Sequence, residues 1–189
     1  MQDRNIKSEQ ESLEIITSMI NQAKGNVGKN AAHYLLWGWL GLAASISQFI
    51  LYQNDIWWHF IGWILMGPIG GIGAFILIRR ATKTNVGHMD KVLGYLWMAF
   101  GFSILIILAN GFVIGWGNAY VFLIILIGLA TFVSGKVLKF HPLQFGGWFA
   151  WAMSGVAIYA GFEWAIISIA LVMVVSYLVP GYLLKKKHG

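Results

Sequence analysis

Apolar residues in this chain fall into six long runs, which are separated by short polar or glycine-containing breaks. The runs cover residues 33–52, 56–78, 92–114, 119–138, 145–162 and 164–184. Each run is roughly 20 residues long, which at 1.5 Å per helical residue is enough to cross the hydrocarbon core of a bilayer. The pattern predicts an all-α integral membrane protein with six transmembrane helices.

The last two runs could instead form one helix, but their combined length argues against it. A continuous helix over 145–184 would extend ~60 Å, about twice the hydrocarbon thickness. A break at Gly161-Phe162-Glu163 gives two helices of ordinary length. The six helices then form three hairpins with short outer connections, of which the first is Gln53-Asn54-Asp55.

Positive charge lies on one side of this arrangement. All 13 Lys and Arg residues fall in the N-terminal segment, the second and fourth connections and the C-terminal tail. Because positively charged loops resist translocation, the pattern predicts that both termini are cytoplasmic. The formal net charge of +6 does not indicate nucleic-acid binding, since these residues are the ones that the topology requires in short loops. The expected partner is the lipid bilayer, including its anionic headgroups.

The first 31 residues are predicted to be a cytoplasmic segment that contains an amphipathic helix over 8–24. Ser8 and Glu11 have the spacing of a capping box, and Leu13, Ile16 and Ile20 then fall on one face. Two interpretations stay open. The helix lies in the membrane interface with its apolar face down, or it binds a cytoplasmic partner protein or a second copy of the chain.

A glycine-rich run with one proline lies in the middle of the second span. Its small and helix-breaking residues are Gly67, Pro68, Gly70, Gly71 and Gly73. One interpretation is a broken helix whose freed carbonyl groups line a substrate cavity, as in many carriers. The other is a kinked helix that packs closely on a neighbour through its glycines.

A weaker candidate site lies at the predicted outer end. Asp55 and His59 are four residues apart, and on a helix they would share a face. With Asn118 and Glu163 they would form a small polar cluster able to hold a cation, if the hairpin ends converge. The alternative is that Asp55 and Glu163 cap their own helices.

Other chemistry is poorly supported. The chain has no cysteine, and no Asp, Glu, Lys, Arg or His lies deep in any run. Ionisable groups inside the membrane mark proton relays and ion paths, so proton coupling is disfavoured. We expect no catalytic residue, no metal and no cofactor. The polar residues Gln48 and Asn110 would bond between helices or line a shallow vestibule.

Several stretches resemble a known family as a set. They are Tyr34-Leu35-Leu36-Trp37-Gly38-Trp39, Pro68-Ile69-Gly70-Gly71, Phe132-Val133-Ser134-Gly135, Gly146-Gly147-Trp148 and the run from Ser176 to Lys185. Together they resemble a family of small, uncharacterised, six-helix bacterial inner-membrane proteins. The resemblance implies this class and a location in the bacterial inner membrane, and it implies no activity or site residue.

Two functions are consistent with the sequence. The first is a small transporter or permease subunit for a neutral or lipophilic solute, acting through the Pro68 kink. The second is a membrane sensor or scaffold that recruits a cytoplasmic partner through residues 8–24. An enzyme is not expected, although a headgroup bound among His33, Lys136 and His141 would favour a lipid-modifying activity.

Overall fold

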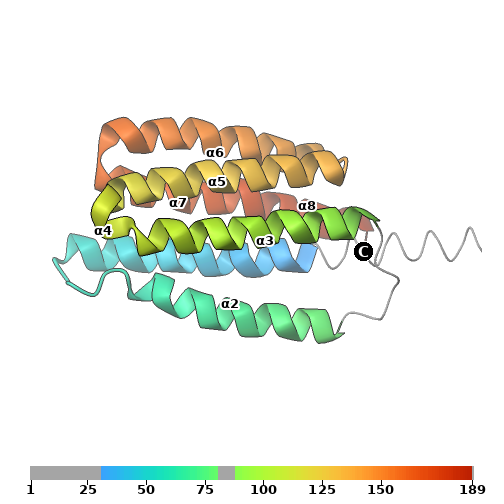
Figure 1. Ribbon diagram of the computed structural model, residues 1–189, viewed down its shortest axis with the longest axis horizontal. Helices are drawn as coiled ribbons and strands as arrows, with labels where there is room; N and C mark the ends of the chain where they lie inside the picture. The colour runs from blue at the N-terminus through green and yellow to red at the C-terminus, as the bar shows by residue number, and fades with distance from the viewer. Residues whose placement is uncertain (1–30, 81–87, 189) are drawn as a thin grey trace, which may run out of the picture.

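The computed structural model describes residues 31–80 and 88–188, which form helices lying side by side along one axis (Figure 1). The helix at the start, Ala31–Gln53, is called the first described helix below. It is followed by α2 (Ile61–Arg80), α3 (His88–Ala109), α4 (Gly111–Ile114), α5 (Trp116–Val137), α6 (His141–Ala160), α7 (Phe162–Val172), the π-helical turn η1 (Met173–Leu178) and α8 (Val179–His188). The amphipathic helix predicted over 8–24 lies outside the described residues.

Five of the described helical stretches are long and apolar enough to cross a membrane. They are Ala31–Gln53, Ile61–Arg80, Met89–Ala109, Trp116–Val137 and the continuous stretch Phe162–Lys186. The prediction of an all-α protein with several membrane spans is therefore confirmed. The predicted fifth span corresponds to α6, which is 20 residues long but is not one of the five. Gln144 and several Gly and Trp residues make α6 less apolar than these five stretches.

The predicted break between the last two helices is confirmed and lies at a single residue. Helix α6 ends at Ala160 and α7 begins at Phe162. Gly161 between them has φ of 91° and ψ of −179°, a region that is essentially restricted to glycine. The chain reverses there and α7 runs back along α6 (Figure 1).

The first outer connection is longer than the three residues predicted for it, since α2 begins at Ile61 and not at residue 56. Asp55 has φ of 54° and ends the preceding helix. The next residues then form successive turns, in which His59 N–H donates to Ile56 C=O (3.1 Å) and Ile61 N–H donates to Trp58 C=O (2.9 Å). Asp55 therefore lies in a loop and does not cap α2.

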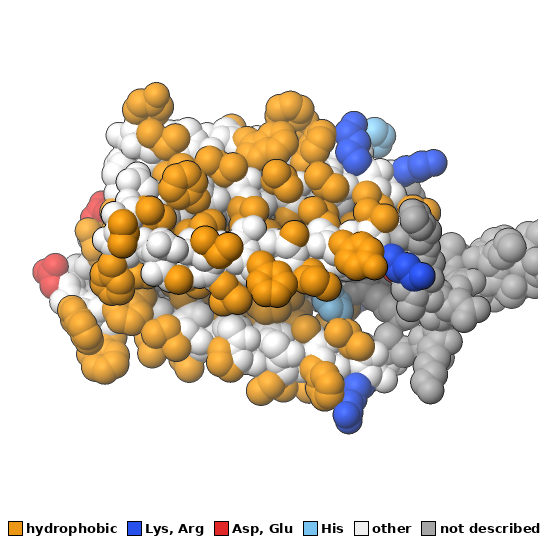
Figure 2. All heavy atoms as spheres, in the orientation of Figure 1, with side chains coloured by type: hydrophobic (Ala, Val, Ile, Leu, Met, Phe, Trp, Pro, Cys, Tyr) orange, Lys and Arg blue, Asp and Glu red, His pale blue; other side chains and the backbone are white. Residues whose placement is uncertain are grey.

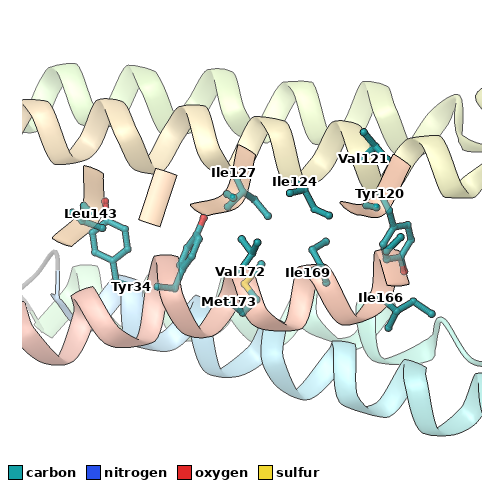
Figure 3. Close-up of a cluster of buried hydrophobic side chains, with 14 of the residues drawn as sticks. Tyr34, Tyr120, Val121, Ile124, Ile127, Leu143, Ile166, Ile169, Val172 and Met173 are labelled. Atoms are coloured by element: carbon teal, nitrogen blue, oxygen red, sulfur yellow. The ribbon is translucent and has the colours of Figure 1, made fainter. Parts of the chain in front are cut away.

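The hydrophobic core lies between α5, α6, the α7–η1 stretch and the first described helix. Figure 3 shows side chains of α5 meeting those of α7 and η1, and four of these are 0–1% exposed: Ile124, Ile166, Ile169 and Val172. Glycines allow the backbones to approach closely. A Cβ atom on Gly146 of α6 would lie 2.7 Å from the Cα atom of Ser176 in η1. Close packing through small residues is the usual way in which helices associate in membranes.

Helix α2 lies at the edge of the bundle, beside the first described helix (Figure 1). Gly70 packs under the ring of Trp37, and Gly73 packs beside Leu36. Most other side chains of α2 are exposed and apolar, and Figure 2 shows apolar side chains over the visible side of the bundle. A surface of this kind is one that lipid or another membrane protein covers.

Most described charged residues separate by sign along the bundle axis; the exception is Asp90, in the first turn of α3 at the basic end. Arg79 and Arg80 end α2, and Lys136 is in the last turn of α5, so these residues share one end of the antiparallel bundle. Asp55, in the loop after the first described helix, and Glu163, in the first turn of α7, lie at the opposite end. Figure 2 shows the Lys and Arg side chains at one end and acidic side chains at the other. The charge separation that the sequence predicts thus coincides with the hairpin geometry.

Candidate functional site

The main polar network inside the bundle is centred on Gln48 of the first described helix, which is 1% exposed. Its Oε1 atom accepts a hydrogen bond from the indole Nε1–H of Trp63 (2.5 Å) and another from the hydroxyl of Tyr120. Its Nε2 atom lies 3.3 Å from Nδ1 of His59. One amide thereby joins the first described helix to the connection before α2, to α2 itself and to α5.

The two donors determine how the Gln48 amide is oriented. An indole N–H can only donate, so the amide oxygen must face Trp63 and the amide nitrogen must face His59. An amide nitrogen is also only a donor, so Nδ1 of His59 acts as the acceptor and the ring proton is on Nε2.

Aromatic rings surround the network. The ring of Tyr52 meets that of His59 edge to face at 5.5 Å, and the ring of Phe162 from α7 meets that of Tyr120 at 5.4 Å. Trp63 and Tyr120 also meet edge to face at 6.2 Å. Edge-to-face pairs add about 0.5–1.5 kcal/mol beyond burial of area. The rings shield the amide from its surroundings and strengthen its hydrogen bonds, since the local dielectric is low.

Three of the four residues of the predicted outer cluster form hydrogen bonds with residues outside that cluster. His59 belongs to the Gln48 network, while Glu163 accepts a hydrogen bond from Nε2 of Gln53 (3.2 Å). Asn118 donates to the carbonyl of Ile114 in the turn before it (2.8 Å), and Asp55 is exposed in its loop. Within 31–80 and 88–188, no three His, Cys, Asp or Glu side chains gather closely enough to hold a metal ion. The outer polar cluster of Asp55, His59, Asn118 and Glu163 stays a prediction.

The glycine-rich run lies in an unbroken helix, because α2 continues from Ile61 to Arg80 through Pro68. Its residues divide between two faces. Gly70 and Gly73 face the first described helix, as the close-packing interpretation requires. Pro68 is exposed, and a Cβ atom on Gly67 or Gly71 would meet nothing within 4 Å. These last two glycines therefore form an open face with no neighbour among the described residues.

A second set of interhelical contacts lies nearer the basic end, and the sequence analysis missed it. The hydroxyl of Ser176 donates to the carbonyl of Gly146 (2.7 Å), so η1 is bonded to α6. The rings of Tyr34 and Tyr177 meet edge to face at 5.7 Å, and Trp97 of α3 meets Tyr34 at 6.1 Å. A six-residue π-helical turn widens the helix at this point, and such turns are rare. Nothing in the local sequence pattern distinguishes this turn from ordinary α-helix.

Part of the polar network could be predicted from the sequence. Gln48 interrupts an apolar run, and an amide in that position must find a hydrogen-bond partner. Its partners Trp63 and Tyr120 are 15 and 72 residues away, and neither spacing is a local motif.

Comparisons with known proteins add no family. No family model, no curated protein and no solved structure matches the chain.

Proposed function

We propose that the chain crosses a bacterial inner membrane six times, with α6 as the additional span and both termini cytoplasmic. Support comes from the position of α6, which packs along α5 on one side and along α7 on the other. A bilayer that covers those two helices also covers α6. Its lower apolar content is compatible with this, because Gly146 and Gly147 face other helices and not lipid. The basic residues of α2, α5 and α8 share one end, which the positive-inside rule assigns to the cytoplasm.

Within that topology, the chain acts as a membrane scaffold that binds a transmembrane helix of another protein. The observation that carries this proposal is the position of α2, which is held along one face and is open along another. Gly67 and Gly71 are one turn apart on the open face, so a second helix can approach the backbone closely there. Pro68 beside them is also exposed.

The tightly filled interior favours a scaffold over a carrier with a central path. Ile124 and Ile166 are 0% exposed, and Gly128 and Gly147 bring α5 and α6 into backbone contact. A transporter for a neutral or lipophilic solute is the second candidate, because Pro68 remains a place where α2 can bend. It predicts that Pro68→Ala changes solute flux in proteoliposomes while the amount of inserted protein stays the same.

Cross-linking in native membranes tests the scaffold directly. The chain has no cysteine, so a single cysteine at position 71 places a photoactivatable cross-linker at one defined position of this chain. The matched control is position 155 on α6, where an added Cβ atom also meets nothing within 4 Å. We expect a discrete adduct with a membrane protein from position 71, and its loss in the Gly67→Leu variant. Adducts that are equal at both positions, or lipid adducts alone, would reject the scaffold.

The sequence also predicts a cytoplasmic partner for the amphipathic helix over 8–24, which lies outside the described residues. Deleting residues 8–24 should abolish co-purification of a soluble protein while the bundle still inserts. Recovery of the same soluble proteins with the truncated chain would remove this part of the proposal.

A further inference from the structure

An apolar groove runs between the first described helix and α2, at the basic end of the bundle. Leu36, Trp39 and Leu40 form one wall, and Gly73, Ile76 and Leu77 form the other. Its volume is about 550 Å³, and it is an open surface groove and not an enclosed cavity. Gly73 lies in close contact with Leu36, since a Cβ atom there would lie 3.0 Å from that side chain, so a larger residue at this position must displace Leu36 or enter the groove.

Trp39 holds the far wall in position. Its ring is 52% exposed, and its Nε1–H donates to the hydroxyl of Tyr182 on α8 (3.1 Å). Leu35, which also lines the groove, packs on Gly181 of the same helix. The wall formed by the first described helix is thus fixed from behind by α8.

Arg80 lies at the basic end of this groove. Gly73, Ile76, Leu77 and Arg80 have spacings of three, four and seven residues, which place them on one face of α2. Arg79 points elsewhere, because its guanidinium lies over the ring of Phe75 at 4.5 Å, outside the groove wall. The two adjacent arginines therefore differ in that Arg80 shares the face of α2 that carries Ile76 and Leu77, whereas Arg79 does not.

We propose that this groove binds an anionic phospholipid, with an acyl chain along the apolar walls and the phosphate on the guanidinium of Arg80. Apolar walls that end near an exposed cation match a molecule with a hydrocarbon chain and an anionic head. Arg suits the head because its planar fork pairs with two phosphate oxygens. Basic pockets between transmembrane helices bind anionic headgroups in the same manner. The groove face of α2 is not the Gly67 and Gly71 face, so this site does not depend on the scaffold proposal.

The test compares lipids retained by the full-length purified protein. The protein is delipidated in mild detergent, incubated with phosphatidylglycerol or phosphatidylcholine of equal chain length, and analysed by native mass spectrometry. We expect preferential retention of phosphatidylglycerol. One lost interfacial cation corresponds to about fivefold weaker retention, so Arg80→Gln should show that drop while Arg79→Gln stays near wild type.

Two further experiments separate the contribution of the lipid's acyl chain from that of its headgroup. Gly73→Leu fills the groove and should lower retention of both lipids, with thermal stability as the check on folding. Glycerol 3-phosphate, which carries the head without the chains, should not displace bound phosphatidylglycerol.

Equal losses in Arg79→Gln and Arg80→Gln would mean a diffuse attraction to the basic end and would overturn the site. Equal retention of the two lipids by the wild-type protein would overturn it as well. If Gly73→Leu fails to fold, the comparison of Arg79→Gln with Arg80→Gln alone tests the lipid site.

Discussion

The indole N–H of Trp63 donates to Oε1 of Gln48 across 2.5 Å and thereby bonds α2 to the first described helix. The bond lies at the end of α2 opposite to Arg80. Between these ends, Gly70 under Trp37 supplies a steric contact. A helix that is mostly exposed is therefore held by one polar contact and a short line of glycine contacts. Its attachment should be sensitive to single substitutions.

Gln48→Met should weaken the attachment of α2. Methionine has a similar shape, but it leaves the Trp63 N–H and the Tyr120 hydroxyl without their acceptor. Interhelical hydrogen bonds in membrane proteins contribute about 0.6–2 kcal/mol, and we expect a loss of unfolding free energy in that range. Steric trapping in bicelles measures it.

Gln53→Met is the control for that change, because Gln53 is exposed and bonds to Glu163 at the end of the bundle. It should alter stability by much less. If both variants lose the same free energy, the buried network does not hold α2.

Gly146→Ala should destabilise the contact between α6 and η1. The added Cβ atom would lie 2.7 Å from the Cα atom of Ser176, so one of the two backbones must move. Overpacking of this kind costs about 1–3 kcal/mol. Thermal unfolding in detergent measures the effect, with Gly155→Ala as control because its Cβ atom meets open space. If Gly146→Ala unfolds at the same temperature as the wild-type protein, the close approach of these helices is absent in the detergent-solubilised protein.

Gly161→Ala should impair the turn between α6 and α7. The φ of 91° and ψ of −179° are strained for any residue with a side chain, at about 1–3 kcal/mol. No steric clash contributes, since the space around Gly161 is open. Unfolding measurements should therefore show a loss in Gly161→Ala and almost none in Gly117→Ala, which lies in α5 with equal space around it. Equal stabilities would show that the chain reverses by another backbone path.

The helices could be predicted from the sequence because a bilayer imposes one length and one polarity on every span. Each of the six apolar runs contains a long described helix, and the break at Gly161 followed from length alone. The backbone conformation of the connections was harder to predict from the sequence. The pairing of Asp55 with His59 assumed that both lie on a helix, and the positive φ at Asp55 removes that assumption.

The polar network and the groove could not be predicted, because both depend on which helices become neighbours. Gln48 was identified as a residue needing a partner, while its donors lie on α2 and α5 at long separations. The glycine run was identified as a close-packing motif, and which glycines face a helix and which face outward depends on the rotation of α2 in the bundle. Arg79 and Arg80 are equivalent in the sequence and differ only through that same rotation.

Site-specific labelling of single cysteines at positions 139 and 163 tests the six-span arrangement most directly. Lys139 precedes α6 and Glu163 follows it, so the two positions lie on opposite sides of the membrane if α6 crosses it. In intact cells, an impermeant maleimide should label Glu163→Cys and should label Lys139→Cys only after the membrane is permeabilised. Labelling of both positions from the outside, or of neither, would contradict the six-span arrangement.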